Sequence, residues 1–381
     1  MTIEGERIVT IGQSAASEVH DLGDVVLLPG LVNAHTHLEF SDCEKPLGRP
    51  GMPLPEWIRQ VIGTRHRNDR DASSAVRIGF EESLRGGVTT IGEISTTAAS
   101  SYSDFVGSNL IAFHEVIGFS AARCDSVQID LEQRLDSLPR NSMVALGISP
   151  HAPYTVHPTL LRNLVDIACE RNLPIAMHLA ESREELELLQ AGTGPFQQLL
   201  ADRSMWDPKA IPLGCKPLHY LLVLAKAPRA LIIHGNYLSD EEIEFLAEQR
   251  EHMSVVYCPR THAFFAHDAY PLEKILSAGV RVAFGTDSRA SNPDLNLLEE
   301  MRHVSRQFPG LTHDRILQMG TIASAEALGL ADETGTLTTG KLADMVAIPC
   351  APHDEPLDAV LHSNATPSHV VVRGKLIALA H

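Results

Sequence analysis

The sequence predicts an α/β protein whose parallel strands close into an eight-stranded barrel. Eight continuously apolar runs occur between Leu31 and Phe284, and each is followed by a helical pattern or a loop. Strands that are apolar throughout are typical of parallel sheets covered on both faces. Eight such units favour a (β/α)8 TIM-like barrel, whose active sites lie at the carboxyl ends of the strands.

An open, doubly wound sheet is the alternative, but no Gly-x-Gly-x-x-Gly follows an early strand. Helical spacing separates the strands, as in Val76, Phe80 and Leu84. Two helices are expected to open with capping boxes, Ser182 with Glu185 and Ser239 with Glu242. The eight expected strands are 31–37, 88–94, 110–116, 144–148, 174–177, 231–233, 254–257 and 280–284.

Both ends of the chain carry short β-type segments that are too small to fold alone. Residues 1–28 combine apolar pairs with glycines, and residues 335–381 return to apolar runs separated by Arg373-Gly374, which suggests a hairpin. We therefore expect an accessory β domain formed by 1–28 and 335–381, beside a barrel of residues 29–334.

Composition excludes several classes of partner. The 381 residues include 48 acidic and 31 basic side chains, a formal net charge of −17. Nucleic acids and anionic membranes both select basic surfaces, so neither is an expected partner. No signal peptide or membrane-spanning run is visible, and the six cysteines lack Cys-x-x-Cys spacing. A cytoplasmic protein with a small-molecule substrate is expected; assembly into a homo-oligomer stays open.

The first expected strand ends in His35-Thr36-His37. Alternation along an extended chain places the two imidazoles on one side, where they can chelate one ion. Nineteen histidines make about one chance His-x-His in a chain of this length, so the pair alone carries little weight.

Three further residues at strand ends strengthen the prediction of a metal site. His178 ends the fifth strand, His234 the sixth, and Asp287 the eighth. Each alone is compatible with a structural role, but together they supply imidazole and carboxylate ligands at one rim of the barrel. Such a set suits one divalent ion, most simply Zn²⁺, although Fe²⁺ and Mn²⁺ accept the same ligands.

These segments resemble the amidohydrolase superfamily, within its deaminase and chlorohydrolase branch. The similarity runs from PGLVNAHTH at 29–37 to GKLADMV at 340–346, nearly the whole chain. The resemblance implies that His35, His37, His178 and Asp287 hold one metal ion, with Glu181 as proton shuttle and His234 orienting or polarising the substrate. PHAPYT at 150–155 resembles adenosine-type and S-adenosylhomocysteine deaminases, which implies that His151 faces the substrate.

A narrower similarity joins HTHLEFS at 35–41 and WIRQVI at 57–62 to the aminodeoxyfutalosine deaminases. Family members usually carry some twenty more N-terminal residues, so we expect either that the accessory domain is incomplete or that the sequence starts late. The insertion at 191–229 and the loop at 43–55 are expected to wall the pocket.

The ligand set predicts hydrolytic deamination. A divalent ion supplies hydroxide near neutral pH, which attacks the amino-bearing ring carbon. Asp287 takes the proton of the water, and Glu181, protonated in a dry pocket, protonates the adjacent ring nitrogen. Because Ile148-Ser149-Pro150 replaces the strand-four lysine of binuclear relatives, one metal is expected rather than two.

Two other functions remain possible from the sequence. The same metal site can release another group from a cyclic amide, a guanidine or a chlorinated ring. A barrel that has lost catalysis and serves only for binding is the third option, though such proteins usually lack ligands or the acid. Glu93 and Glu115, near strand ends, are minor candidates for contacting ribose hydroxyls.

Overall fold

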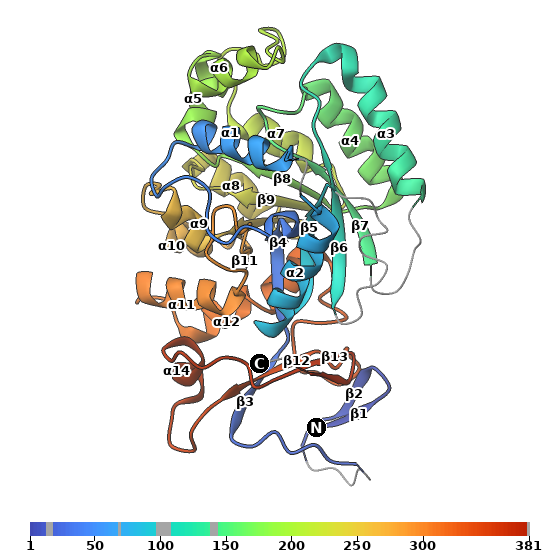
Figure 1. Cartoon of the computed structure of the whole chain (residues 1–381), viewed down its shortest axis with the longest axis vertical. Helices are drawn as coiled ribbons and strands as arrows, with labels where there is room; N and C mark the ends of the chain where they lie inside the picture. Colours follow the sequence, from blue (N-terminus) through green and yellow to red (C-terminus); the bar gives the residue numbers. More distant parts are fainter. Residues whose placement is uncertain (13–17, 68–69, 97–107, 138–143, 379–381) are drawn as a thin grey trace.

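The computed structural model describes residues 1–12, 18–67, 70–96, 108–137 and 144–378. Residues 13–17 and 379–381 of the expected accessory segments lie outside this description. A parallel barrel forms the body of the molecule, and a smaller antiparallel region lies at one end of it (Figure 1).

Eight parallel strands form the barrel sheet, each hydrogen-bonded to the next in chain order. The sheet closes where Thr36 bridges Asp287 and the backbone carbonyl of His35 accepts the N–H groups of Thr286 and Asp287, at 3.1 and 3.2 Å. The predicted eight-stranded barrel is therefore confirmed. Its strands are β4 (Leu31–Thr36), β5 (Val88–Ser95), β6 (Asn109–Val116), β7 (Val144–Pro150), β8 (Ile175–Leu179), β9 (Ala230–His234), β10 (Met253–Tyr257) and β11 (Val282–Phe284).

Apolar side chains on both faces explain why these strands have no polar alternation. On β9, Leu231 and Ile233 belong to a core cluster that fills the barrel interior, whereas Ile232 packs into the larger cluster shared with the surrounding helices. Because successive side chains point to opposite faces, both faces must be apolar when both are covered.

Helices surround the barrel and extend over the carboxyl ends of its strands (Figure 1). The Ser239–Glu242 capping box is confirmed, since both reciprocal hydrogen bonds are present. Only one of the two hydrogen bonds of the expected Ser182–Glu185 box is present. Ser182 Oγ accepts the Glu185 N–H, but the Glu185 carboxylate accepts the Ala180 N–H instead of that of Ser182. The α-helices are α1 (Leu54–Arg65), α2 (Ala72–Arg85), α3 (Cys124–Ser137), α4 (Pro158–Arg171), α5 (Arg183–Ala191), α6 (Pro195–Asp202), α7 (Pro217–Leu224), α8 (Asp240–Glu248), α9 (Pro259–Phe264), α10 (Leu272–Ser277), α11 (Leu297–Gln307), α12 (His313–Met319), α13 (Ile322–Leu328) and α14 (Pro356–Leu361).

The two ends of the chain meet in the antiparallel region, as predicted. β3 (Val25–Pro29) pairs with β12 (Met345–Pro349), which pairs with β13 (His369–Val372) and so extends to β14 (Lys375–Ile377). The β13–β14 hairpin turns at Arg373 and Gly374, both with positive φ, the conformation that a two-residue hairpin requires. β1 (Thr2–Glu4) and β2 (Arg7–Thr10) form a separate two-stranded sheet.

None of the described helices has the length and apolar character needed to cross a membrane. All six cysteines are free thiols.

Candidate metal centre and active site

Four of the predicted residues converge at the carboxyl end of the barrel. His35 Nε2 and His37 Nε2 each lie 3.7 Å from Asp287 Oδ1, and His37 Nε2 lies 3.3 Å from His178 Nε2. Ligands about 2.0–2.1 Å from one ion are about 3–3.6 Å from each other. The ligand atoms of His35, His37 and His178 all lie within 4.8 Å of one another, and Asp287 lies 3.7 Å from two of them, so the three histidines fit a single ion that Asp287 adjoins.

Buried histidine nitrogens without partners support this fit. Neither ring nitrogen of His35, nor Nδ1 of His37, has a hydrogen-bond partner in the described part of the chain. Buried polar atoms are normally paired. His35 Nε2 is the unpaired atom that faces Asp287, at 3.7 Å, so a bound ion would supply its missing partner. His178 Nδ1 lies 2.9 Å from the His151 carbonyl; because that oxygen only accepts, Nδ1 carries the proton and the Nε2 lone pair faces the cluster.

Electrostatics keep these groups in the protonation states that ligands need. Burial, reinforced by His35, lowers the pKa of both His37 and His178, so the rings are neutral. Burial by itself would raise the pKa of Asp287, but His35, 3.7 Å away, and the other surrounding imidazoles hold it well below its usual range. A neutral-imidazole and carboxylate set is the donor set of zinc-type ions.

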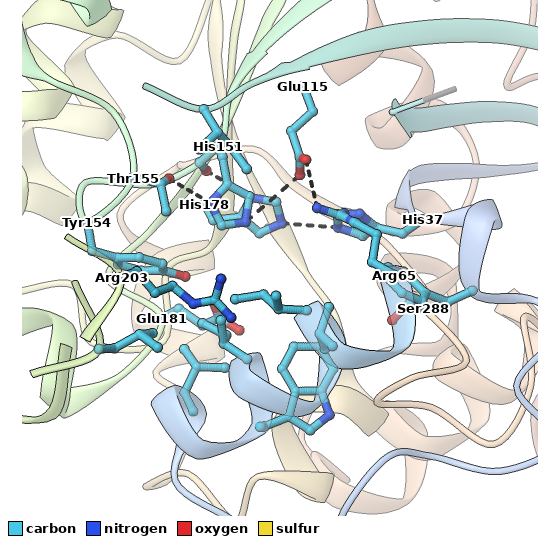
Figure 2. Close-up of a pocket in the computed structure, with 18 of the residues that line it drawn as sticks. His37, Arg65, Glu115, His151, Tyr154, Thr155, His178, Glu181, Arg203 and Ser288 are labelled. Atoms are coloured by element: carbon cyan, nitrogen blue, oxygen red, sulfur yellow. Dashed lines mark hydrogen bonds and ion pairs between the residues drawn. The ribbon is translucent and has the colours of Figure 1, made fainter. Parts of the chain in front are cut away.

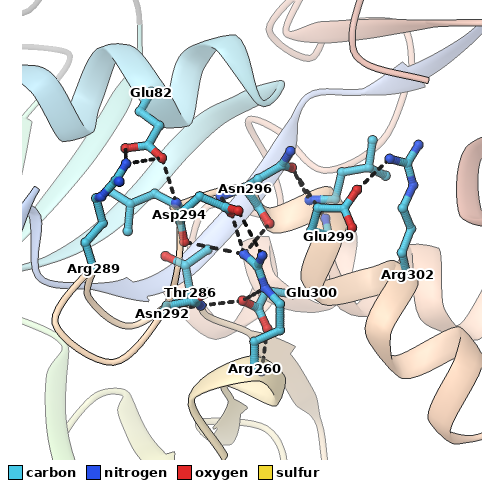
Figure 3. A network of polar contacts seen from close by, with 12 residues as sticks. Glu82, Arg260, Thr286, Arg289, Asn292, Asp294, Asn296, Glu299, Glu300 and Arg302 are labelled. Atoms are coloured by element: carbon cyan, nitrogen blue, oxygen red, sulfur yellow. Dashed lines mark hydrogen bonds and ion pairs between the residues drawn. The ribbon is translucent and has the colours of Figure 1, made fainter. Parts of the chain in front are cut away.

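The loop that carries Asp287 is fixed by several polar contacts. Thr36 Oγ1 donates to the Asp287 carbonyl at 2.7 Å, and Ser291 Oγ donates to Asp287 Oδ2 at 3.0 Å. Asn292 Nδ2 donates to the Thr286 carbonyl and to Glu300, which pairs with Arg260 (Figure 3). These contacts hold Asp287 in left-handed conformation, at φ 54°.

Glu181 and His234 adjoin the cluster. Glu181 Oε1 lies 3.4 Å from His234 Nε2, and both side chains are buried. Burial, with repulsion from Asp287 and Glu185, raises the pKa of Glu181 well above that of an ordinary carboxyl group. A carboxylic acid that stays protonated near neutral pH can donate a proton to a bound base.

Glu185 supports Glu181 through the backbone. Its carboxylate accepts the N–H groups of Ala180 and Glu181 at 2.8 and 2.9 Å, while Asn236 Nδ2 donates to the Glu181 carbonyl at 2.9 Å. Ala180 is held at φ 54° by this arrangement. The turn after β8 is therefore tightly constrained.

His151 follows β7 and lies beside the histidine cluster. Its Nδ1 lies 2.7 Å from Thr155 Oγ1, and its Nε2 lies 3.9 Å from Glu115 (Figure 2). Burial, together with Arg65, lowers the pKa of His151 to about 3, so its ring is neutral. Arg65 itself bridges Glu115 at 3.2 Å and Glu39 at 2.7 Å.

These residues open into a cavity of about 280 Å³, near the lower limit of small-molecule sites, about 300 Å³. Its wall is mainly apolar and comes from α1, α6 and the segment after α6. Most of its polar lining residues lie at the inner end, in or just after the barrel strands. Arg203 instead follows α6 (Figure 2). The apolar lining residues are Phe40, Leu54, Trp57, Ile58, Val61, Ile62, Leu199, Leu200 and Met205.

The structure brings all seven sequence-predicted site residues to this cavity or to its inner end. Residues of the 191–229 insertion line it, whereas only Leu54 does so from the expected 43–55 wall. Glu93 is wrong as a substrate candidate, because it is buried and accepts the Leu38 N–H. The sequence did not identify Arg65 and Arg203 as lining residues of the cavity. Arg65 could have been found, because it lies one helical turn beyond the expected helix at 57–62.

Comparison with known proteins identifies the family of the chain. A family model described as "Amidohydrolase family" matches residues 26–377. The chain belongs to the amidohydrolase family, and it is a hydrolase acting on carbon–nitrogen bonds.

Two curated relatives and one solved structure are similar along most of their length. A 5-methylthioadenosine/S-adenosylhomocysteine deaminase of Moorella thermoacetica is 30% identical over 87% of this chain and 75% of its own. An aminodeoxyfutalosine deaminase of Nitratiruptor sp. is 29% identical, over 97% and 91%. Helicobacter pylori aminofutalosine deaminase, in complex with methylthio-coformycin, has a TM-score of 0.82 at 23% identity, over 93% and 87%.

Proposed function

We propose that the protein is a metal-dependent hydrolytic deaminase of an adenine-type nucleoside or a related aminated heterocycle. The observation that carries the proposal is the pairing of buried Glu181 with His234, 3.4 Å apart, beside the three-histidine group and the adjoining Asp287. Curated relatives named as deaminases of adenine nucleosides support the same reaction.

We assign the four-residue cluster to one divalent ion and favour Zn²⁺. When bound, such an ion supplies a water nucleophile at neutral pH. Asp287 is ionised and lies 3.7 Å from His35 and His37, so it would accept the proton that the attacking water loses.

Glu181 supplies the acid. Because its pKa is raised, it is protonated when a substrate binds and delivers its proton to the ring nitrogen beside the attacked carbon. It then takes the proton held by Asp287 and passes it to the departing amino group, so that ammonia leaves. As the carbonyl forms, the new hydroxyl group gives its remaining proton to Asp287, which returns it to Glu181 and restores the starting state. His234, in contact with Glu181, stabilises the tetrahedral carbon that precedes this step.

The cavity supports a flat, aminated ring attached to a larger substituent. Its inner end offers Glu181, His234 and neutral His151 as hydrogen-bonding partners, which suits the ring. Its apolar wall from α1 and α6 suits a substituent of low polarity. We assign His151 to substrate binding, because its ring lines the cavity beside His178.

Ammonia release from the zinc-loaded enzyme tests the reaction. The panel is adenosine, 5-methylthioadenosine, S-adenosylhomocysteine, aminodeoxyfutalosine, guanine and cytosine. We expect ammonia from at least one adenine nucleoside, with loss of the activity in Glu181→Gln. No ammonia from any member, or product formation with another leaving group from a cyclic amide or chlorinated ring, would overturn the proposal.

We also propose a cytoplasmic location. The six free thiols, one of them in an exposed residue, are consistent with a reducing compartment. Fractionation of expressing cells, followed by thiol titration under denaturing conditions, tests this: all six cysteines should react without prior reduction.

A further inference from the structure

A second group of metal-ligating side chains lies outside the catalytic cavity. His313 is the first residue of α12, Asp358 lies in the first turn of α14, and His362 follows the last residue of α14. Their ligand atoms all lie within 4.8 Å of one another. None of the three lines the catalytic cavity.

The separations match those of one bound ion. Asp358 Oδ1 lies 3.2 Å from His313 Nδ1 and 3.4 Å from His362 Nδ1. Four ligands arranged tetrahedrally, at about 2.0–2.1 Å from an ion, are about 3.3 Å apart. The distance from each of these two nitrogens to the carboxylate oxygen is therefore the distance expected between two ligands of one ion.

Local structure holds the three groups in place. Asp358 in α14 and His362 just after it are four residues apart, which places them on the same side of the helix. The far nitrogen of His362, Nε2, lies 2.9 Å from Ser305 Oγ of α11. A hydrogen bond at the second nitrogen is the usual way in which a metal-binding imidazole is oriented.

The surroundings allow an ion to enter and favour positive charge. The side chains of His313, Asp358 and His362 are 30%, 52% and 47% exposed. Water can thus reach the site and complete the coordination. His313 and Asp358 line a surface depression together with Asp314 and Glu355. These additional carboxylates make the local charge negative, which attracts cations.

We propose that His313, Asp358 and His362 form a second metal site, which binds a divalent transition-metal ion of the zinc type. Two imidazoles with one carboxylate favour Zn²⁺ or its neighbours over Mg²⁺ and Ca²⁺, which prefer oxygen ligands. The site is structural and joins helices rather than reaching the substrate.

Its position explains what the ion would do. α14 lies in the segment between β12 and β13, and it packs against α11 and α12 of the barrel. Arg302 of α11 already anchors this segment by donating to the Val360 and Ala365 carbonyls, at 2.9 and 2.7 Å. An ion shared by α12 and α14 adds a second tie between the barrel and the C-terminal segment.

Metal content tests the proposal with the full-length enzyme. Wild type, His362→Ala, His313→Ala and a matched control, His353→Ala, are loaded with Zn²⁺, dialysed against buffer with micromolar free Zn²⁺, and measured by mass spectrometry. His353 is an exposed histidine shortly before α14 that is not part of the group. Thermal unfolding is followed at zero and micromolar added Zn²⁺.

We expect about two ions per chain in wild type and in His353→Ala, and about one in each of the other variants, with ammonia release unchanged. Added Zn²⁺ should raise the Tm of wild type more than that of His362→Ala. One ion in wild type, two ions in both cluster variants, or one ion in His353→Ala would overturn the proposal. A poorly folded His362→Ala leaves His313→Ala, from the other helix, as the deciding variant.

Discussion

Glu185 holds Glu181 by its backbone: the buried Glu185 carboxylate accepts the N–H of Glu181 at 2.9 Å and that of Ala180 at 2.8 Å. Burial outweighs these hydrogen bonds and raises the pKa of Glu185 to about 7. The carboxylate thus fixes the turn on which the proposed acid stands, and its charge contributes to the raised pKa of Glu181. Glu185 acts as a positioning residue.

Glu185→Gln should lower kcat about 10- to 100-fold, because an amide offers one acceptor where the turn needs two. The substitution also removes a charge that raises the pKa of Glu181, so the alkaline loss of activity should begin at lower pH. The matched control is Glu187→Gln, an exposed position on the same helix, α5. Equal pH profiles for Glu185→Gln and wild type would leave Glu185 with a structural role only.

Glu181→Gln should lower kcat by about 10²–10⁴-fold, since the amide cannot donate a proton to the ring nitrogen. The metal content should not change, because Glu181 is not among the assigned ligands. Steady-state ammonia release and metal analysis on the same preparation measure both. A variant that keeps wild-type kcat would remove Glu181 from the mechanism.

Activity should fall on the alkaline side as Glu181 ionises. Its pKa is raised by burial, so the protonated form is fully present below the pKa of an ordinary carboxyl group and is lost as pH rises through the shifted value. Above that point kcat/KM should fall about tenfold per pH unit. Because the pKa of Asp287 is held low, no matching acidic loss is expected from that residue near neutrality. A flat alkaline limb in kcat/KM would contradict the assignment.

His37→Ala should remove the catalytic ion, because it deletes one ligand from a buried cluster. We expect about one ion fewer per chain than in wild type, and ammonia release lower by a factor of about 10³ or more. His66→Ala is the control for metal content, since His66 borders the cavity but is not part of the cluster. An unchanged ion count in His37→Ala would show that the ligands are different residues.

Two glycine substitutions in helices should have opposite effects on stability. A Cβ at Gly79 of α2 would lie 2.0 Å from Ser41 Oγ and 2.9 Å from Ser41 Cβ, whereas a Cβ at Gly63 of α1 meets nothing within 4 Å. Gly79→Ala should therefore cost about 1–3 kcal/mol, and Gly63→Ala should gain about 0.5–1 kcal/mol from helix propensity. Urea unfolding measures both. A stable Gly79→Ala protein would mean that η1 (Leu38–Phe40) and the adjoining Ser41 move to make room.

The sequence alone determined the barrel and the rim where its site lies. Apolar runs of strand length are local, and so is the position of His35, His178 or Asp287 at the end of such a run. Once the strands are parallel and in order, residues at their carboxyl ends must share one rim. The β13–β14 hairpin was visible for the same reason, since Arg373-Gly374 sets the turn within a few residues.

Only the tertiary structure determined the hydrogen-bond and ion-pair partners of the polar side chains. Ser182 and Glu185 have the spacing of a capping box, yet Glu185 turns to the N–H groups of Ala180 and Glu181, which a local pattern cannot foresee. His313 and Asp358 are brought together across 45 positions by the packing of α12 on α14. The physical reason is common to both: a strand or turn follows from neighbours in sequence, whereas a polar side-chain contact depends on which groups the fold brings within about 3 Å of each other.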